Sequence, residues 1–128
     1  MVRVRPGQRF PVVVATAADA GGLVPDRRFI PNKSADAVDI FLVASDVTSV
    51  NLRLVQRIGR EFNMTDSEYA GIDDQYPDSS QDFTITANGN TSVRYVITPG
   101  MDFALLVTAF TGGASKRIEG FGMLVNRA

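Results

Sequence analysis

The sequence predicts an all-β protein: an antiparallel β-sandwich of about seven strands with Greek-key or jelly-roll connections, or, as second choice, a partly open β-barrel. Two observations support this class. Short runs rich in Val, Ile, Thr and Phe recur along the chain, and clusters of Gly, Pro, Asn, Asp and Ser separate them. No segment favours a helix over a strand.

The length of 128 residues predicts one domain. Residues 1–9 are expected to be a basic N-terminal arm, because they hold Arg3, Arg5 and Arg9 and show no periodicity. Residues 10–128 are expected to form the single β domain. The start of the chain loosely imitates a secretory signal, but its apolar stretch is short and opens with a Pro, which favours the arm.

The first strand is expected over residues 10–16, where β-branched residues dominate. Residues 17–36 contain Gly21-Gly22 and two prolines, which predicts an irregular loop. Loops of this length are usually functional or pinned by a neighbour. Packing on the sheet or on another subunit is expected to pin this one through its apolar residues, which are Leu23, Val24, Phe29 and Ile30.

The middle of the chain predicts two further strands. Residues 38–44 are a short apolar run, typical of a strand that is buried on most of both faces, and Ser45-Asp46 predicts a turn after it. Residues 47–62 are predicted to be a strand because apolar and polar residues alternate there. A helix is the alternative, since apolar residues also recur every three or four positions, but Gly59 and the β-branched start favour the strand.

A hairpin is predicted around Asn88-Gly89-Asn90. Asn and Gly tolerate the positive φ of short hairpin loops. The flanking segments, residues 83–87 and 91–98, both alternate apolar with polar residues.

Two more strands are predicted after a turn at Pro99-Gly100. Residues 102–110 are apolar on both faces, and residues 112–115 predict a turn into a last strand over residues 117–126. Glycines at alternate positions of this last strand, such as Gly122, permit close approach of another backbone or of an aromatic ring.

The composition argues against catalysis. Without His the commonest general base at neutral pH is missing, and without Cys there are no disulfides or thiolate metal sites. The serines have no His to activate them as nucleophiles. We therefore predict that the protein is not an enzyme and binds no cofactor.

Charge is segmented along the chain. Residues 1–60 hold nine basic and five acidic side chains, residues 61–82 seven acids and no base, and residues 83–128 four bases and two acids. Eleven of the thirteen basic residues are Arg, whose planar fork suits paired contacts with carboxylates at interfaces. The acidic segment either binds Ca²⁺ or pairs with Arg, and because no spacing matches a calcium loop, no metal site is predicted.

The net charge of −1 predicts no attraction to nucleic acid, and no apolar stretch is long enough to span a membrane. Apolar loop residues need cover, which a homo-oligomer supplies. The predicted interface residues of the arm are Arg3, Arg5, Arg9 and Phe10. Those of the loops are Leu23, Val24, Arg27, Arg28, Phe29, Ile30, Tyr69, Ile72 and Tyr76.

Three segments stand out together: the basic arm, the double-sided apolar strand at residues 103–107 and the final strand at residues 121–125. With them the chain resembles, in general character, small all-β structural proteins of tailed-bacteriophage virions, particularly capsid decoration or cement proteins. The resemblance implies a protein made in the host cytoplasm and located on the capsid surface. It also implies assembly as a trimer or a dimer, with a major capsid protein as partner and the arm clamping a neighbouring subunit or the shell.

Two other functions stay open. A carbohydrate- or ligand-binding β-sandwich would stack a sugar ring on Tyr69 and Tyr76. A small carboxylate-dependent hydrolase would need two acids that face each other across a cleft, with Asp73 and Asp74 as candidates.

Overall fold

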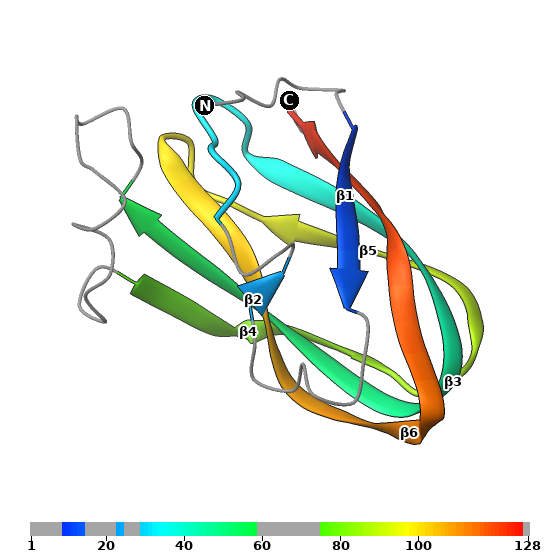
Figure 1. Ribbon diagram of the computed structural model, residues 1–128. Helices are drawn as coiled ribbons and strands as arrows, with labels where there is room; N and C mark the ends of the chain where they lie inside the picture. The colour runs from blue at the N-terminus through cyan, green and yellow to red at the C-terminus, as the bar shows by residue number, and fades with distance from the viewer. Residues whose placement is uncertain (1–8, 15–22, 25–28, 59–74, 127–128) are drawn as a thin grey trace.

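The computed structural model describes residues 9–14, 23–24, 29–58 and 75–126 (Figure 1). All its strands belong to one sheet, and every pairing is antiparallel. The all-β, antiparallel prediction is confirmed, whereas the seven-strand sandwich is not, because the described residues form six strands in a single sheet. The strands are β1 (Arg9–Val14), β2 (Leu23–Val24), β3 (Ala37–Ile58), β4 (Gln75–Ile85), β5 (Gly89–Val96) and β6 (Met101–Val125).

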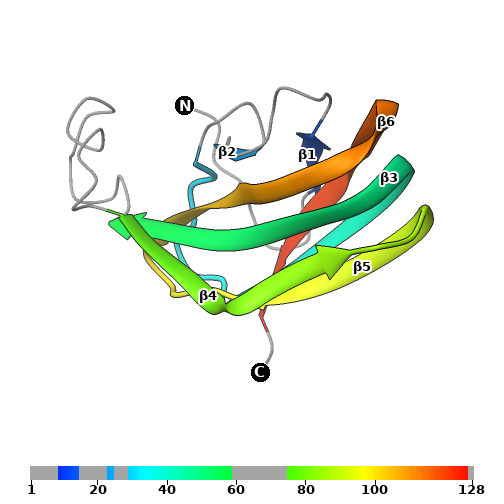
Figure 2. The ribbon, with the colours of Figure 1, turned by 90° about the horizontal axis from the view of Figure 1, so that it is seen from below.

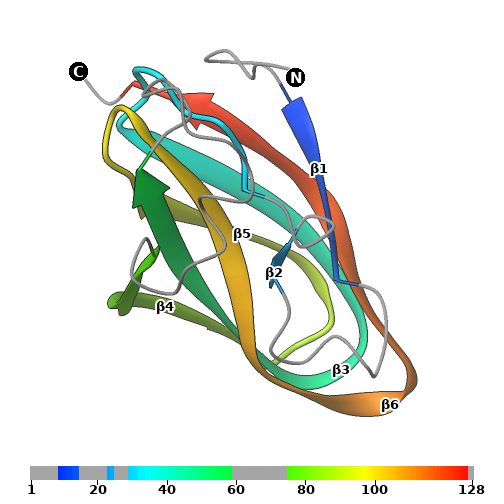
Figure 3. The same ribbon diagram turned by 60° about the vertical axis from the view of Figure 1, so that its left-hand side comes forward.

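The sheet bends across its middle into two halves. Residues 37–45 of β3 and 117–125 of β6 pair with each other, with β1 and with β5, and form what we call the β1 half. Residues 47–58 and 101–112 pair with each other, with β4 and with β2, and form the β4 half. Figure 1 shows β3 and β6 bending together at the lower right, and Figures 2 and 3 show the same curvature from other sides.

The turns predicted at Ser45-Asp46 and at residues 112–115 are instead bends within continuous strands. Residues 113–116 of β6 bulge out opposite Asp46. Asp46 takes a positive φ of 54°, and its carboxylate accepts a hydrogen bond from the backbone N–H of Ser115 at 3.0 Å. The predicted reversal of the chain was wrong because a bulge bends both strands without ending their pairing.

The hairpin predicted around Asn88 was also wrong. β4 and β5 pair one after the other along the same edge of β3, and within these described strands they share no register with each other. Gly89 has a φ of 108°, and the side-chain oxygen of Asn88 accepts a hydrogen bond from the backbone N–H of Val47 at 2.8 Å. A positive φ is compatible with a bend as well as with a hairpin loop. Asn88-Gly89 therefore lies at the bend of the sheet, beside the bend of β3 at Asp46.

The core lies between the two halves. Inward side chains of β3 are Ile40 and Leu42 in the β1 half and Leu52 and Leu54 in the β4 half, and all four are buried. The fully buried Tyr95 of β5 donates a hydrogen bond from its hydroxyl to the backbone carbonyl of Leu52 at 3.2 Å, which joins the halves. Burial raises the pKa of Tyr95. Because β3 stays a strand to Ile58, the strand predicted over residues 47–62 is confirmed as far as that residue, against the helix alternative.

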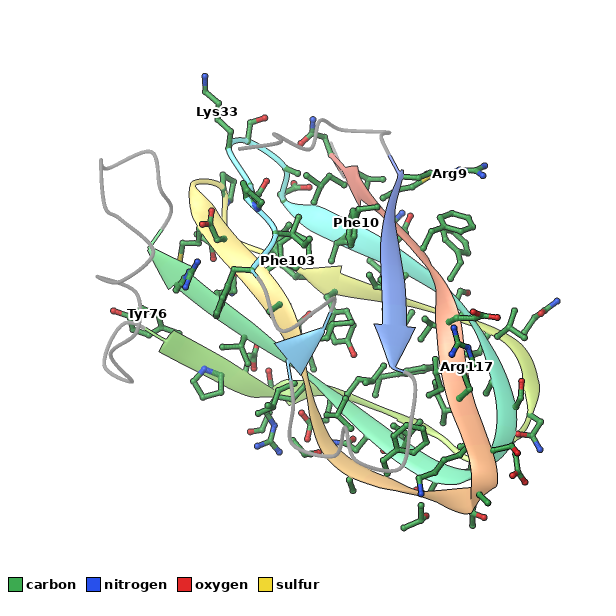
Figure 4. The ribbon with its side chains drawn as sticks, in the orientation of Figure 1. Arg9, Phe10, Lys33, Tyr76, Phe103 and Arg117 are labelled. Atoms are coloured by element: carbon green, nitrogen blue, oxygen red, sulfur yellow. The ribbon has the colours of Figure 1, made fainter. Side chains whose placement is uncertain are left out.

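The predicted first strand is present as β1. The side chain of Phe10, on this strand, lies in the core. Phe10 is only 5% exposed, and its ring packs edge-on against Phe103 at 5.8 Å between centroids (Figure 4). A Cβ atom on Gly122 would overlap the Phe10 ring, so glycine is needed there, as expected for close approach of an aromatic ring. The assignment of Phe10 to an interface arm was therefore wrong.

The end of the predicted loop is pinned to β6. Ile30 and Phe103 exchange two backbone hydrogen bonds, of 2.7 and 3.1 Å. Asn32 is 1% exposed; its backbone N–H donates to Asp102, its side-chain amide donates to the carbonyls of Ala35 and Thr98, and its side-chain oxygen accepts from the N–H of Ala35. Packing on the sheet is thus confirmed for this part of the loop.

Candidate protein-interaction surface

The outer surface of the β1 half is built by alternation along β3. Buried Ile40 and Leu42 alternate with Phe41 and Val43, which are 38% and 46% exposed. Successive side chains of a strand point to opposite faces, so this apolar run has one face in the core and the other in solvent. The prediction that the run is buried on most of both faces was wrong for the outer face.

An aromatic pair lies at the centre of this surface. Phe41 and Phe121 of β6 are direct cross-strand partners, and their rings stack with centroids 5.1 Å apart. The guanidinium carbon of Arg9, on β1, lies 4.5 Å from the centroid of the Phe121 ring. We call the apolar residues of this surface the outer patch: Phe41 and Val43 of β3, Val96 of β5, and Phe121, Met123 and Val125 of β6.

Two ion pairs lie on the surface of the outer patch: Asp39 and Arg94 stand in the row between Phe41 and Val96, and Arg117 and Glu119 lie beyond Phe121 on β6. Arg94 of β5 donates hydrogen bonds of 2.6 and 2.9 Å to the two carboxylate oxygens of Asp39, and these bonds hold the pKa of Asp39 below its ordinary value. On β6, Arg117 donates bonds of 3.1 and 3.0 Å to Oε2 of Glu119. Exposed ion pairs add little stability. Apolar and aromatic side chains with charged groups beside them are, however, common in protein interfaces.

The outer surface of the β4 half is different. Asn51 accepts a hydrogen bond from Thr84 at 2.9 Å and donates one to Thr108. Arg53 binds both carboxylate oxygens of Asp82 at 2.9 and 2.8 Å, and these bonds lower the pKa of Asp82. These polar groups are hydrogen-bonded to one another. The outer surface of the β4 half is therefore polar at these positions, whereas that of the β1 half carries the apolar outer patch.

Four of the predicted loop residues lie against the sheet. Leu23 and Val24 form β2, which pairs with β6. Ile30 packs against the core, and the ring of Phe29 lies 3.9 Å from the guanidinium carbon of Arg57. The sheet therefore holds the backbone of residues 23–24 by pairing and covers the side chain of Ile30.

Two predicted interface residues are exposed. Arg9 lies on the outer patch, and Tyr76, near the start of β4, is 52% exposed (Figure 4). The structure does not bring the two together, because they belong to different halves of the sheet. The other predicted interface residues lie outside the described residues: Arg3, Arg5, Arg27, Arg28, Tyr69 and Ile72.

The aromatic pair itself was missed by sequence reasoning. The position of Phe41 could have been inferred from the alternation of side chains along a strand. Phe41 stands two positions after the charged Asp39, so a regular strand places both side chains on one face. A face that carries a charged side chain is not expected to be fully buried. The pairing of Phe41 with Phe121 depends on the register of β3 and β6. The two residues are far apart in the chain, so the local sequence does not indicate that they meet.

The acidic segment is described only at its end. Asp82 pairs with Arg53 of the same chain, so pairing with Arg is observed for this residue. Asp78 accepts hydrogen bonds from Ser80 and Gln81, which lower its pKa. Within the parts of the chain that the structure describes, no three Asp, Glu, His or Cys side chains are grouped to hold a metal ion.

Comparisons with known proteins do not assign a family. A scan of family models, a search of curated proteins and a search of solved structures return no match for this chain. The described strands and connections include no helix able to cross a membrane. The function is therefore inferred from the outer patch and from the sequence.

Proposed function

We propose that the protein is a non-enzymatic structural protein of a virion, a capsid decoration or cement protein that binds the capsid surface by protein–protein contact. The observation that carries the adhesive part is the outer patch, with its stacked aromatic pair of exposed Phe41 and half-buried Phe121. The virion setting is supported by the resemblance of the sequence to small all-β proteins of phage particles.

The outer patch has the composition that binding surfaces favour. Aromatic residues, Phe among them, together with Met and Arg are enriched in protein interfaces relative to the rest of the surface. Phe41, Phe121 and Arg9 supply these types on three neighbouring strands.

The aromatic pair is also held in place before any partner arrives. The rings stack on each other across paired strands, and Arg9 covers one of them. Side chains that are already ordered lose less conformational entropy on binding, which strengthens the association. A fixed sheet surface therefore suits a protein whose role is attachment.

The test is co-sedimentation of the full chain with capsid particles from its source. Wild type should pellet with the particles, whereas Phe41→Asp should stay in the supernatant, because it places an unpaired charge at the centre of the outer patch. Thr84→Asp, on the outer surface of the β4 half, is the matched control and should pellet. Circular dichroism checks that both variants fold, and equal behaviour of all three proteins contradicts the proposal.

A carbohydrate-binding module is the second candidate, favoured by the exposure of Tyr76. An exposed aromatic ring gives a sugar a stacking platform. Binding on a glycan array that Tyr76→Ala abolishes, and that Phe41→Asp leaves intact, would support this function over capsid attachment.

A further inference from the structure

We propose that the side chain of Gln81 blocks the free edge of β5, so that no further strand adds to the sheet there. The strand at the edge of a sheet carries backbone N–H and C=O groups that can pair with another chain, and natural β proteins protect such edges. The inference concerns the edges of the sheet and goes beyond the proposed function, because it does not depend on what the outer patch binds.

Apart from the two-residue β2, three described strands pair with a neighbour on one side only: β1, β4 and β5. β1 contains Pro11 and β4 contains Pro77, and proline has no N–H with which to bind a further strand. β4 also has a bulge at residues 79–82. β5 contains no proline and pairs with β3 in unbroken register, so its edge needs another form of protection.

A hydrogen bond just beyond the end of β5 shows which of its backbone groups face away from β3. The N–H of Ile97 donates to the carbonyl of Asp36, which directly precedes β3, at 3.1 Å. Successive residues of an antiparallel strand direct their N–H and C=O groups to alternate sides. The groups of Val96 therefore point away from β3, and the unbroken register gives Arg94 and Ser92 the same direction.

The side chain of Gln81 occupies these groups at Val96. Its Oε1 accepts a hydrogen bond from the N–H of Val96 at 2.6 Å, and its Nε2 donates to the carbonyl of Val96 at 3.0 Å. A side-chain amide has the donor and the acceptor of a peptide group. Gln81 thus makes with Val96 both bonds that a residue of a neighbouring antiparallel strand would make.

The bulge in β4 places Gln81 in this position. Residues 79–82 of β4 stand opposite Arg53 alone, and bulges commonly redirect a side chain. The Nε2 atom of Gln81 also donates to Oδ2 of Asp78 at 2.8 Å, while Oδ1 of Asp78 accepts from the N–H of Ser80 at 3.0 Å. Asp78 therefore anchors the side chain of Gln81 beside β5.

Loss of the Gln81 side chain should open the edge of β5 along its whole length. In Gln81→Ala both backbone groups of Val96 are left unpaired, and the space beside them is empty. The strand best prepared to pair with this edge is β5 of a second copy, because it is already extended and loses little conformational entropy. Two identical edges pair antiparallel about a two-fold axis.

The test is the mass of Gln81→Ala by sedimentation equilibrium. Its association constant should exceed that of wild type about tenfold or more, because pairing returns the lost backbone bonds to Val96. Gln56→Ala is the matched control. Gln56 accepts a bond of 2.7 Å from the N–H of Thr98, beyond the end of β5, so its loss should leave the mass as in wild type. Circular dichroism checks folding, and if Gln81→Ala does not fold, Asp78→Ala, which removes only the anchor of Gln81, takes its place.

Hydrogen exchange followed by NMR locates the association. In wild type the N–H of Val96 should exchange slowly, and those of Ser92 and Arg94 rapidly. In associated Gln81→Ala all three should exchange slowly, since a second strand now binds them. A Gln81→Ala protein with the mass of wild type would overturn the inference. Association that leaves Ser92 and Arg94 in rapid exchange, or equal association of Gln56→Ala, would overturn it as well.

Discussion

Replacing Phe10 by Ala tests whether β1 is part of the folded core. Phe10 is 5% exposed, packs edge-on against Phe103 across the two halves of the sheet and lies over Gly122. Truncation leaves a cavity that β1 cannot readily fill, because the residue opposite Phe10 in the register is Gly122 itself.

The expected loss follows from the burial. Phe→Ala changes in well-packed cores cost about 3–5 kcal/mol, from lost transfer free energy plus the cavity. Domains are typically stable by about 5–15 kcal/mol, so Phe10→Ala should remove a large share of the stability. Tyr76→Ala, at a side chain 52% exposed, should cost less than about 1 kcal/mol and serves as the control.

Urea unfolding followed by circular dichroism measures both variants. For Phe10→Ala we expect a much lower midpoint with an unchanged m value, since the surface exposed on unfolding stays nearly the same. A free energy of unfolding within about 1 kcal/mol of wild type would refute the reasoning and would place Phe10 in a separate arm.

Three further predictions concern the fold. Gly122→Ala should lower stability by about 1–3 kcal/mol in thermal unfolding, because its Cβ overlaps a core ring; an unchanged melting temperature would contradict this packing. Asn32→Ala should cost at least ~2 kcal/mol in urea unfolding, since it leaves the buried N–H and carbonyl of Ala35 without their partner, and a smaller loss would show that this network is dispensable. Arg94 holds the folded-state pKa of Asp39 below its ordinary value of 3.8, so Asp39→Asn should be less stable than wild type above that pH. The difference should vanish as the pH falls through the lowered pKa, and a difference independent of pH would rule out the ion pair as its cause.

Much of the strand content was predictable from local pattern. β-branched and alternating segments located β1 and long parts of β3 and β6, because these side chains suit a half-buried pleated surface. The positions of the corner were predictable too, since Asp46, Asn88 and the glycines near residue 112 were all recognised as turn residues.

What those turn residues do was not predictable. Asn88-Gly89 would look the same in a hairpin and in a bend, because both need a positive φ. The difference lies in which strand receives the hydrogen bonds, and here β3 receives them from both β4 and β5. Pairing of this kind joins residues far apart in the chain, so a local pattern does not contain it.

The residues of the candidate surface were likewise predictable only in part. Arg9 was identified from sequence as an interface residue, and it lies on the outer patch. Phe41 and Phe121 were not identified, because the apolar run around Phe41 was interpreted as buried on both faces and its ring partner is set by register. Phe10 was misassigned because it directly follows the basic residues of the predicted arm, whereas its neighbours in space are apolar.

The claim that the outer patch binds protein is tested most directly by photo-cross-linking. A benzophenone amino acid is placed at position 121, in the outer patch, and in a second protein at position 108, on the polar outer surface of the β4 half. The account predicts an intermolecular cross-linked product from position 121 in the purified, assembled protein and none from position 108. Products from position 108 alone, or from neither position in a protein that still self-associates or binds capsids, would contradict it.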